Sequence, residues 1–195
     1  MKLPRFNANE EQKSWFFYDW ANSAYITTIA TVLYAPYLTS VAERAACGFA
    51  GDEDRKCTEH LSVLGLSVSA GSLVFYVVTL ATVISAFVLP IVGAVADRVD
   101  SKKTLMARLA WCGAAVAALM FFVTGTNWQL GAGLLVVANL FYAASIVVYD
   151  AILVEVAEPD ERDRISSQGW AFGYLGGGLL LAVNLAIVTV KPFGL

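Results

Sequence analysis

Four long segments of this 195-residue chain contain no Asp, Glu, Lys or Arg, namely residues 20–42, 61–96, 109–149 and 165–190. Each is longer than the roughly 20 residues that a helix needs to cross the apolar core of a bilayer. Their apolar residues run continuously instead of alternating, which favours helices over the strands of a membrane barrel. With 58% hydrophobic residues, 15% charged residues and a mean hydropathy of +0.64, the composition excludes an ordinary soluble domain.

The third uncharged segment is long enough for two helices, and a polar turn at residues 124–129 interrupts it. The sequence therefore predicts an all-α polytopic membrane protein, a partial N-terminal transmembrane domain over residues 1–195. We place its five transmembrane helices at about 15–41, 70–96, 104–123, 129–154 and 167–190. The main connections are an outer loop over 42–69 and cytoplasmic loops over 97–103 and 155–166.

The basic residues predict the orientation of these helices. If the N-terminus is cytoplasmic, nine of the 13 Lys and Arg residues fall on the inner side, where positive charge is enriched. We therefore expect an integral protein of the cell membrane with its N-terminus in the cytoplasm. The nine residues are Lys2, Arg5, Lys13, Arg98, Lys102, Lys103, Arg108, Arg162 and Arg164.

The cysteines and the single histidine limit the chemistry of the chain. Cys47 and Cys57 lie in the expected outer loop, where an oxidising compartment would allow a disulfide, and two free thiols are the alternative. His60 has no cluster of ligands at metal-binding spacing, so we expect no metal.

The chain contains no phosphate-binding loop, dinucleotide fingerprint or nucleophile elbow. We expect no cofactor, no enzymatic activity and no nucleic-acid partner.

The segment "GAVADRVDSKK" follows the second expected helix and fits the pattern G-x-x-x-D-R-x-x-x-[RK]-[RK]. Gly93 would allow a close helix contact, and Asp97 can accept hydrogen bonds or pair with a cation such as Arg98. Lys102 and Lys103 provide the positive charge expected on the cytoplasmic side. A generic positively charged loop is the alternative, but it does not explain the Gly-x-x-x-Asp-Arg spacing.

Polar side chains recur on one face of the first expected helix and on one face of the fourth. Such groups within a span usually face the protein interior or a watery cavity. The residues that we expect to line a substrate cavity are Asp19, Asn22, Tyr25, Asn139, Tyr142 and Tyr149. Two interpretations of Asp19 remain open, a structural or gating group near the cytoplasmic face and a carboxylate that binds a cation, a proton or an amino group.

Glycine is concentrated in the fifth expected helix. Glycines three and four residues apart allow two helix backbones to approach closely. We expect this helix-packing role, with direct substrate contact as the alternative, for Gly169, Gly173, Gly176, Gly177 and Gly178.

The motif at residues 93–103 resembles the signature that follows the second helix of the major facilitator superfamily, with Asp100 where that family usually has glycine. Three further segments are similar to its vacuole-effluxer-like branch: "YDWANSAY" (18–25), "YDAILVEVA" (149–157) and "SSQGWAFGYLGGGLLLAVN" (166–184). The resemblance implies a fold of two six-helix halves. The lipid bilayer, a small-molecule substrate and the missing C-terminal half are then the expected partners.

The same resemblance implies secondary active transport of small solutes by alternating access, with amino-acid efflux as the specific activity. It also implies a gating role for the acid and base of the loop motif. We expect a cytoplasmic charge network of Asp19, Asp97, Arg98, Asp150 and Arg164. A non-transporting scaffold or sensor with the same fold, and a transporter of lipid-like substrates, are the alternatives.

Overall fold

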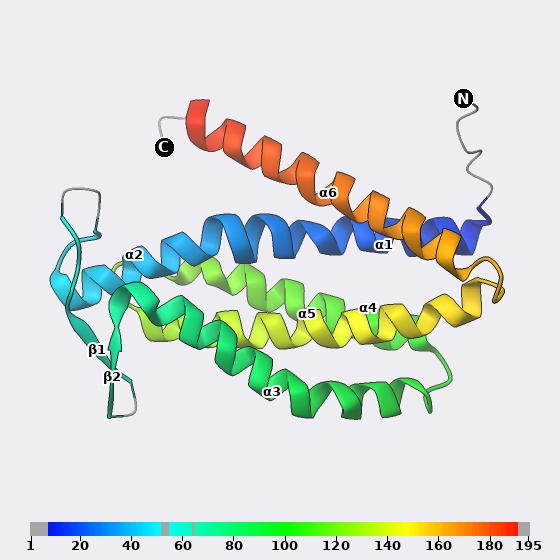
Figure 1. The fold of residues 1–195 in the computed structure, drawn as a ribbon, viewed down its shortest axis with the longest axis horizontal. Coiled ribbons are helices and arrows are strands. Elements are labelled where there is room, and N and C mark those ends of the chain that lie inside the picture. Colours follow the sequence, from blue (N-terminus) through cyan, green and yellow to red (C-terminus); the bar gives the residue numbers. More distant parts are fainter. Residues whose placement is uncertain (1–7, 52–54, 64, 191–195) are drawn as a thin grey trace. The chain divides into compact units, whose positions relative to one another are not determined.

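The computed structural model describes residues 8–51, 55–63 and 65–190, and Figure 1 shows that long helices dominate them. Three of the 13 basic residues counted for the orientation lie outside these ranges, namely Lys2, Arg5 and Lys191. The chain divides into two compact units. The first comprises Met1–Thr31 and Tyr149–Leu195, and the second comprises Val32–Val148.

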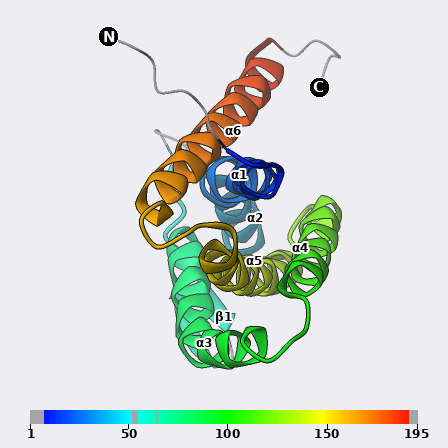
Figure 2. The ribbon, with the colours of Figure 1, turned by 90° about the vertical axis from the view of Figure 1, so that its right-hand side faces the viewer.

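The first unit is built on the packing of two helices, α1 (Glu10–Ala24) and α6 (Arg162–Val190). Figures 1 and 2 show α6 crossing α1 at close range. The last two turns of α5 (Trp128–Val156) belong to this unit, as does the start of the π-helical segment η1 (Tyr25–Leu33). Phe16 is fully buried and stacks on Phe172 of α6, with the ring centroids 5.6 Å apart.

A capping box explains why α1 begins at Glu10, five residues before the predicted start of the first helix. The Asn9 side chain accepts a hydrogen bond from the Gln12 backbone N–H at 2.8 Å, and the Gln12 side chain accepts one from the Asn9 N–H at 3.1 Å. These bonds satisfy amide groups that would otherwise lack partners at a helix start. Glu10 and Glu11 add negative charge to the first turn, which the helix dipole favours.

The second unit contains the remaining elements in chain order. They are α2 (Tyr34–Cys47), β1 (His60–Val63), β2 (Leu66–Ser69), the 3₁₀ turn η2 (Ala70–Ser72), α3 (Leu73–Ala96), α4 (Lys102–Leu119), the 3₁₀ turn η3 (Met120–Phe122) and most of α5. Tyr34 and Tyr37 connect α2 to the segment around the start of α5. Their hydroxyls donate to the carbonyl oxygens of Gly131 at 3.1 Å and Val123 at 2.6 Å.

The predicted outer loop over 42–69 has more structure than the sequence suggested. Helix α2 continues to Cys47 and ends where Gly48 adopts a left-handed conformation, with φ of +78°. The strands β1 and β2 then form an antiparallel hairpin in which His60 pairs with Ser69. Gly65 lies just before β2 with φ of +83°. The prediction gave this connection no secondary structure, because the alternation in residues 60–69 is weak and adjoins an uncharged stretch.

Four helical segments in the described part of the chain are long and apolar enough to cross a membrane. They are Ala70–Ala96, Lys102–Phe122, Trp128–Val156 and Arg162–Val190. The predicted first span, 15–41, lies in α1, η1 and α2 instead of in one continuous α-helix. Large apolar side chains on these segments are exposed, for example Trp111 of α4 at 77%. Such surfaces are typical of helices that face lipid.

Candidate functional site

The candidate site of the first unit is centred on Tyr149, the first residue of its part of α5. The Tyr149 ring stacks on the indole of Trp15, with ring centroids 4.1 Å apart and the planes at 8°. Tyr18 lies 5.3 Å from the same ring. The Trp15 Nε1–H donates to the backbone carbonyl of Tyr149 at 3.0 Å. These contacts bury the Tyr149 side chain, which is 4% exposed, and fix the direction of its hydroxyl.

Two carboxylates lie close to this tyrosine. Asp19 is on α1, one turn after Trp15, and Asp150 follows Tyr149 on α5. Asp19 has the Ser23 side chain as a hydrogen-bond partner and Asp150 as a charged neighbour. The Asp19 side chain is half-buried, whereas Asp150 is exposed. The structure thus brings predicted residues of the first and fourth spans into one cluster.

The glycines of α6 form the opposite wall of this cluster. A Cβ atom placed on Gly173 would lie 2.6 Å from Asp19 Oδ2, and one on Gly169 would lie 3.0 Å from the Tyr149 hydroxyl oxygen and closer still to Trp15. Gly176 and Gly177 similarly lie against α1, whereas a Cβ on Gly178 would have no described atom within 4 Å. The close approach of α6 to α1 therefore involves the first four predicted glycines and not Gly178.

Several buried polar atoms of the first unit have no hydrogen-bond partner within the described residues. They are Asn22 Nδ2, Thr28 Oγ1, the Tyr149 hydroxyl oxygen and Gln168 Oε1. Buried polar groups are normally hydrogen-bonded, so these atoms are candidate hydrogen-bonding groups of the site. Sequence reasoning identified Asn22 and Tyr149 but missed Trp15, Ser23 and Gln168. The signal for Trp15 and Ser23 was their four-residue spacing from Asp19, which places all three on one helix face.

The other predicted cavity residues are placed as follows. Tyr25 is the first residue of η1 and belongs to the first unit. Asn139 and Tyr142 are half-buried on α5 in the second unit, where the Ser145 hydroxyl donates to the Tyr142 carbonyl oxygen at 2.8 Å. The six predicted cavity residues are therefore divided between the two units, and the first unit holds the four residues Asp19, Asn22, Tyr25 and Tyr149.

The loop motif lies at the junction of α3 and α4. Asp97 and Arg98 are exposed just after α3, and the Asp97 backbone N–H donates to the carbonyl of Gly93 at 3.0 Å. The Ser101 side chain caps α4, which begins at Lys102. Gly93 faces Val147 of α5, and a Cβ there would lie at an ordinary contact distance of 3.8 Å from the Val147 side chain.

Arg164, the predicted basic partner in the charge network, lies in the first turn of α6. It forms an ion pair with Glu161 at 2.6 Å, and both side chains are partly exposed. Its guanidinium is thus engaged locally in this conformation.

Cys47 and Cys57 form a disulfide with their Cα atoms 5.9 Å apart. The bond connects the end of α2 to the segment that leads into the β1–β2 hairpin. Nearby, the Glu43 carboxylate accepts a hydrogen bond from the Gly51 N–H at 2.8 Å, and the Arg55 guanidinium lies 3.6 Å from the centroid of the Phe49 ring. Gly51 and Cys57 are thereby held against α2.

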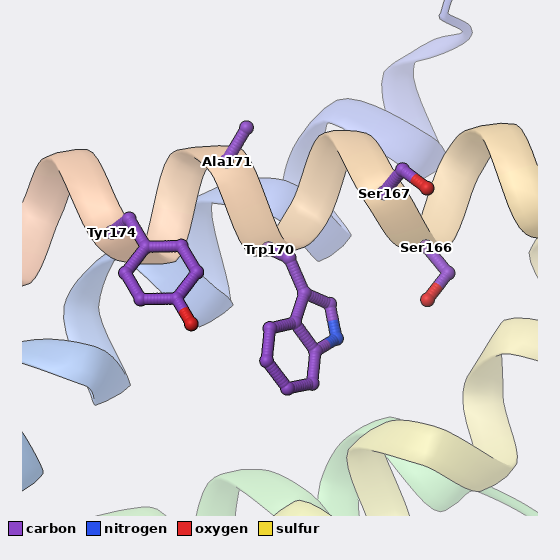
Figure 3. A pocket seen from close by; sticks show the side chains of 5 residues that line it. All are labelled: Ser166, Ser167, Trp170, Ala171 and Tyr174. Atoms are coloured by element: carbon purple, nitrogen blue, oxygen red, sulfur yellow. The ribbon is translucent and has the colours of Figure 1, made fainter.

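An open pocket lies along one side of α6, and Figure 3 shows the side chains that line it. They are Ser166, Ser167, Trp170, Ala171 and Tyr174. Trp170 and Tyr174 are exposed and form a tilted ring pair with centroids 6.1 Å apart. Their aromatic surface lies on a membrane-length helix, so it is suited to contact lipid or another apolar surface.

Comparison with known proteins places the chain in a family. The family described as "Vacuole effluxer Atg22 like" matches residues 7–162. An uncharacterised transporter of the major facilitator type, YxiO from Bacillus subtilis, is 26% identical over 181 residues, which cover 93% of this chain and 38% of the relative. No solved structure matches the chain significantly.

Fungal relatives carry the name autophagy-related protein 22. The protein from Pyricularia oryzae is 23% identical over 186 residues, covering 83% of this chain and 27% of the relative. The protein 22-2 from Aspergillus oryzae is 30% identical over 129 residues, covering 66% of this chain and 21% of the relative. The chain therefore spans well under half the length of these relatives.

The apolar helices and these matches define a polytopic, all-α integral membrane protein of the major facilitator type. Within that class, the chain belongs to the vacuole effluxer Atg22-like family. The family consists of transporters, not enzymes.

Proposed function

We propose that the full protein is a secondary transporter that moves small solutes by alternating access, and that amino-acid efflux is its activity. The observation that carries the proposal is the polar cluster in which Asp19 and Asn22 of α1 lie with Tyr149 of the membrane-length helix α5. Polar and charged groups in a membrane are costly to bury, so they usually belong to a substrate or ion pathway. The name of the matching family, vacuole effluxer, supports export as the direction.

The chemistry of the cluster favours a substrate with a positively charged amino group. The carboxylates of Asp19 and Asp150 supply negative charge for the amino group, whereas the unsatisfied Nδ2 donor of Asn22 can bind an acceptor atom of the substrate. Charge-assisted hydrogen bonds between an ammonium group and a carboxylate are strong and directional. A small zwitterion would also need a partner for its carboxylate, and the rest of the transporter is proposed to provide it.

The proposal includes an orientation and a partner. The N-terminus lies in the cytoplasm of a cell whose plasma membrane holds the protein, and the disulfide of Cys47 and Cys57 faces the outside. Facilitators transport a substrate between two halves of one protein. The partner of this chain is accordingly the C-terminal half of the same transporter, and the α3–α4 motif with Asp97 and Arg98 acts in the gate between the halves.

Efflux from proteoliposomes tests the proposed substrate class. The full-length protein is reconstituted, the vesicles are loaded with labelled amino acids or with labelled sugars, and release is compared with that from protein-free vesicles. We expect release of amino acids only, slowed by D19N and unchanged by the matched control D160N, an exposed acid between α5 and α6. Correctly folded protein that releases no amino acid would refute the proposal.

A further inference from the structure

The helical stretch from Glu10 to Cys47 contains a π-helical section between two α-helices. This section, η1 (Tyr25–Leu33), is nine residues long and connects α1 to α2. π-Helices are rare, usually extend over a single turn, and occur frequently at functional sites. The division of the chain into compact units falls between Thr31 and Val32, so the two ends of η1 belong to different units. Its geometry and its place in the chain make η1 a candidate functional segment.

Pro36 explains why the α-helix is interrupted at this point. A proline inside an α-helix removes one backbone hydrogen bond, and its ring clashes with the carbonyl four residues earlier, here that of Val32. Because η1 ends at Leu33, Pro36 lies in the first turn of α2 instead, where proline is tolerated. Six of the nine residues of η1 are β-branched, which lowers their preference for the α-helix. The sequence thus weakens the α-helix in η1.

The threonine hydroxyls of η1 are paired differently from those of the α-helices. In α2 and α3, for example, the hydroxyls of Thr39 and Thr79 donate to the carbonyl four residues earlier, at 3.0 and 2.8 Å. In η1 the Thr31 hydroxyl donates to the Ile26 carbonyl, five residues earlier, at 2.7 Å. The Thr28 side chain is 1% exposed, and its hydroxyl has no hydrogen-bond partner within the described residues. The π-helical form therefore leaves a buried donor unpaired.

An α-helical form of η1 would satisfy this donor. In an α-helix the Thr28 hydroxyl can donate to the carbonyl of Ala24, four residues earlier. The two forms are thus disfavoured for different reasons, the π form by an unpaired hydroxyl and the α form by the clash of Pro36 with the Val32 carbonyl. We propose that η1 is a two-state segment that exchanges between a π-helix and an α-helix, with the Thr28 hydroxyl paired only in the α form.

The exchange acts next to the candidate site. It rotates the residues after η1 relative to those before it, because the two helix types have different numbers of residues per turn. The Asn22 carbonyl accepts the backbone N–H of Tyr25, the first residue of η1. A Cβ on Gly177 of α6 would lie 3.3 Å from the Thr27 Cβ. The inference rests on the proposed function in one respect, because it assigns the exchange to the transport cycle.

Two variants shift the exchange in opposite directions. P36A restores a backbone donor and removes the clash with the Val32 carbonyl, so it favours the α form. T28V replaces the hydroxyl by a methyl group, so it removes the unpaired donor from the π form. We expect T28V to shift the equilibrium toward the π form by about 5- to 100-fold, the factor that corresponds to an unsatisfied buried hydroxyl. T39V is the matched control, because the Thr39 hydroxyl is paired within α2.

Solid-state NMR of the full-length protein in lipid bilayers, labelled with ¹³C and ¹⁵N on threonine, measures the exchange without transport. The backbone signals of Thr27 and Thr31 report the conformation of η1. In the wild type we expect relaxation dispersion at both residues, which T28V suppresses and T39V leaves unchanged. The signals of P36A are expected to differ from those of T28V. In proteoliposomes, both variants are expected to release amino acids more slowly than the wild type, whereas T39V keeps the wild-type rate.

Several results would overturn the proposal. One is the absence of dispersion in the wild type together with identical signals in P36A, because η1 would then have a single conformation. Another is equal dispersion in T28V and the wild type, which does not depend on P36A folding correctly. Wild-type efflux from folded P36A and T28V would overturn the assignment to the transport cycle. Dispersion without amino-acid efflux by the wild type would leave the two-state segment intact and refute only the proposed function.

Discussion

The three consecutive glycines of α6 allow a sharp test of the packing between α1 and α6. A Cβ on Gly176 would meet the backbone carbonyl and the side chain of Trp20, and one on Gly177 would lie 2.8 Å from Thr27 Oγ1. A Cβ on Gly178 would have no described atom within 4 Å. Since a backbone cannot move aside as a side chain can, G176A is the most disruptive of the three alanine variants and G178A the least.

The magnitude follows from comparing neighbours in one helix. Replacing Gly by Ala within a helix stabilises it by about 0.5–1 kcal/mol, and this term is common to all three variants. It therefore cancels between G176A and G178A, and their difference is the cost of overpacking, about 1–3 kcal/mol. In a domain of this size that corresponds to a difference in Tm of about 2–12 °C. We expect G177A between the two, because the Thr27 hydroxyl can rotate away.

Differential scanning fluorimetry of the three variants in one detergent measures this order. G178A is expected to melt at or above the wild-type temperature, and G176A below it. Equal melting temperatures for G176A and G178A would refute the inference that the glycines of α6 bring it into backbone contact with α1.

Three further predictions concern other parts of the chain. Reduction of the Cys47–Cys57 bond, or the variant C47S, is expected to lower the free energy of unfolding by about 2–3 kcal/mol, because a closed loop is lost. Chemical denaturation with and without reductant measures this, and an unchanged midpoint would contradict it. The variant W15F removes the hydrogen bond to the Tyr149 carbonyl and is expected to lower the free energy of unfolding by about 0.5–1.5 kcal/mol. Chemical denaturation measures the loss, with W170F as the control because Trp170 is exposed. If Asp97 acts in gating, D97N is expected to change the rate of efflux more than the substrate Kd, and a variant with wild-type rate would exclude that role.

The fold class was predictable from the sequence because the length of an uncharged run decides whether a helix can cross a bilayer. The ends of the helices were harder to predict from the sequence. Helix α1 begins at Glu10 through a capping box of two polar residues, Asn9 and Gln12, which the hydropathy pattern does not register. Helix α2 continues through Glu43 and Arg44 to Cys47, since charged residues near a membrane surface do not end a helix, whereas the left-handed Gly48 does.

Some residues of the candidate site were predictable from the sequence, but their arrangement was not. Spacing along one helix placed Asp19 and Asn22 on a common face, and the polar residues of the fourth span included Tyr149. Trp15 fixes Tyr149 by stacking and a hydrogen bond, although the two residues lie 134 positions apart in the sequence. Local periodicity cannot predict such a long-range contact. At Gly93 a Cβ would lie at an ordinary contact distance of 3.8 Å from Val147, so the motif pattern did not indicate how closely the helices approach there.

The central claim is that this chain is part of a carrier that exposes its site alternately to the two sides of a membrane. Trans-stimulation measures this directly in proteoliposomes that contain the full-length protein. We predict that an unlabelled amino acid on the outside accelerates the efflux of the same labelled amino acid from the inside, because a loaded carrier returns faster than an empty one. Efflux that external substrate leaves unchanged or slows, in vesicles with correctly folded protein, would contradict the account.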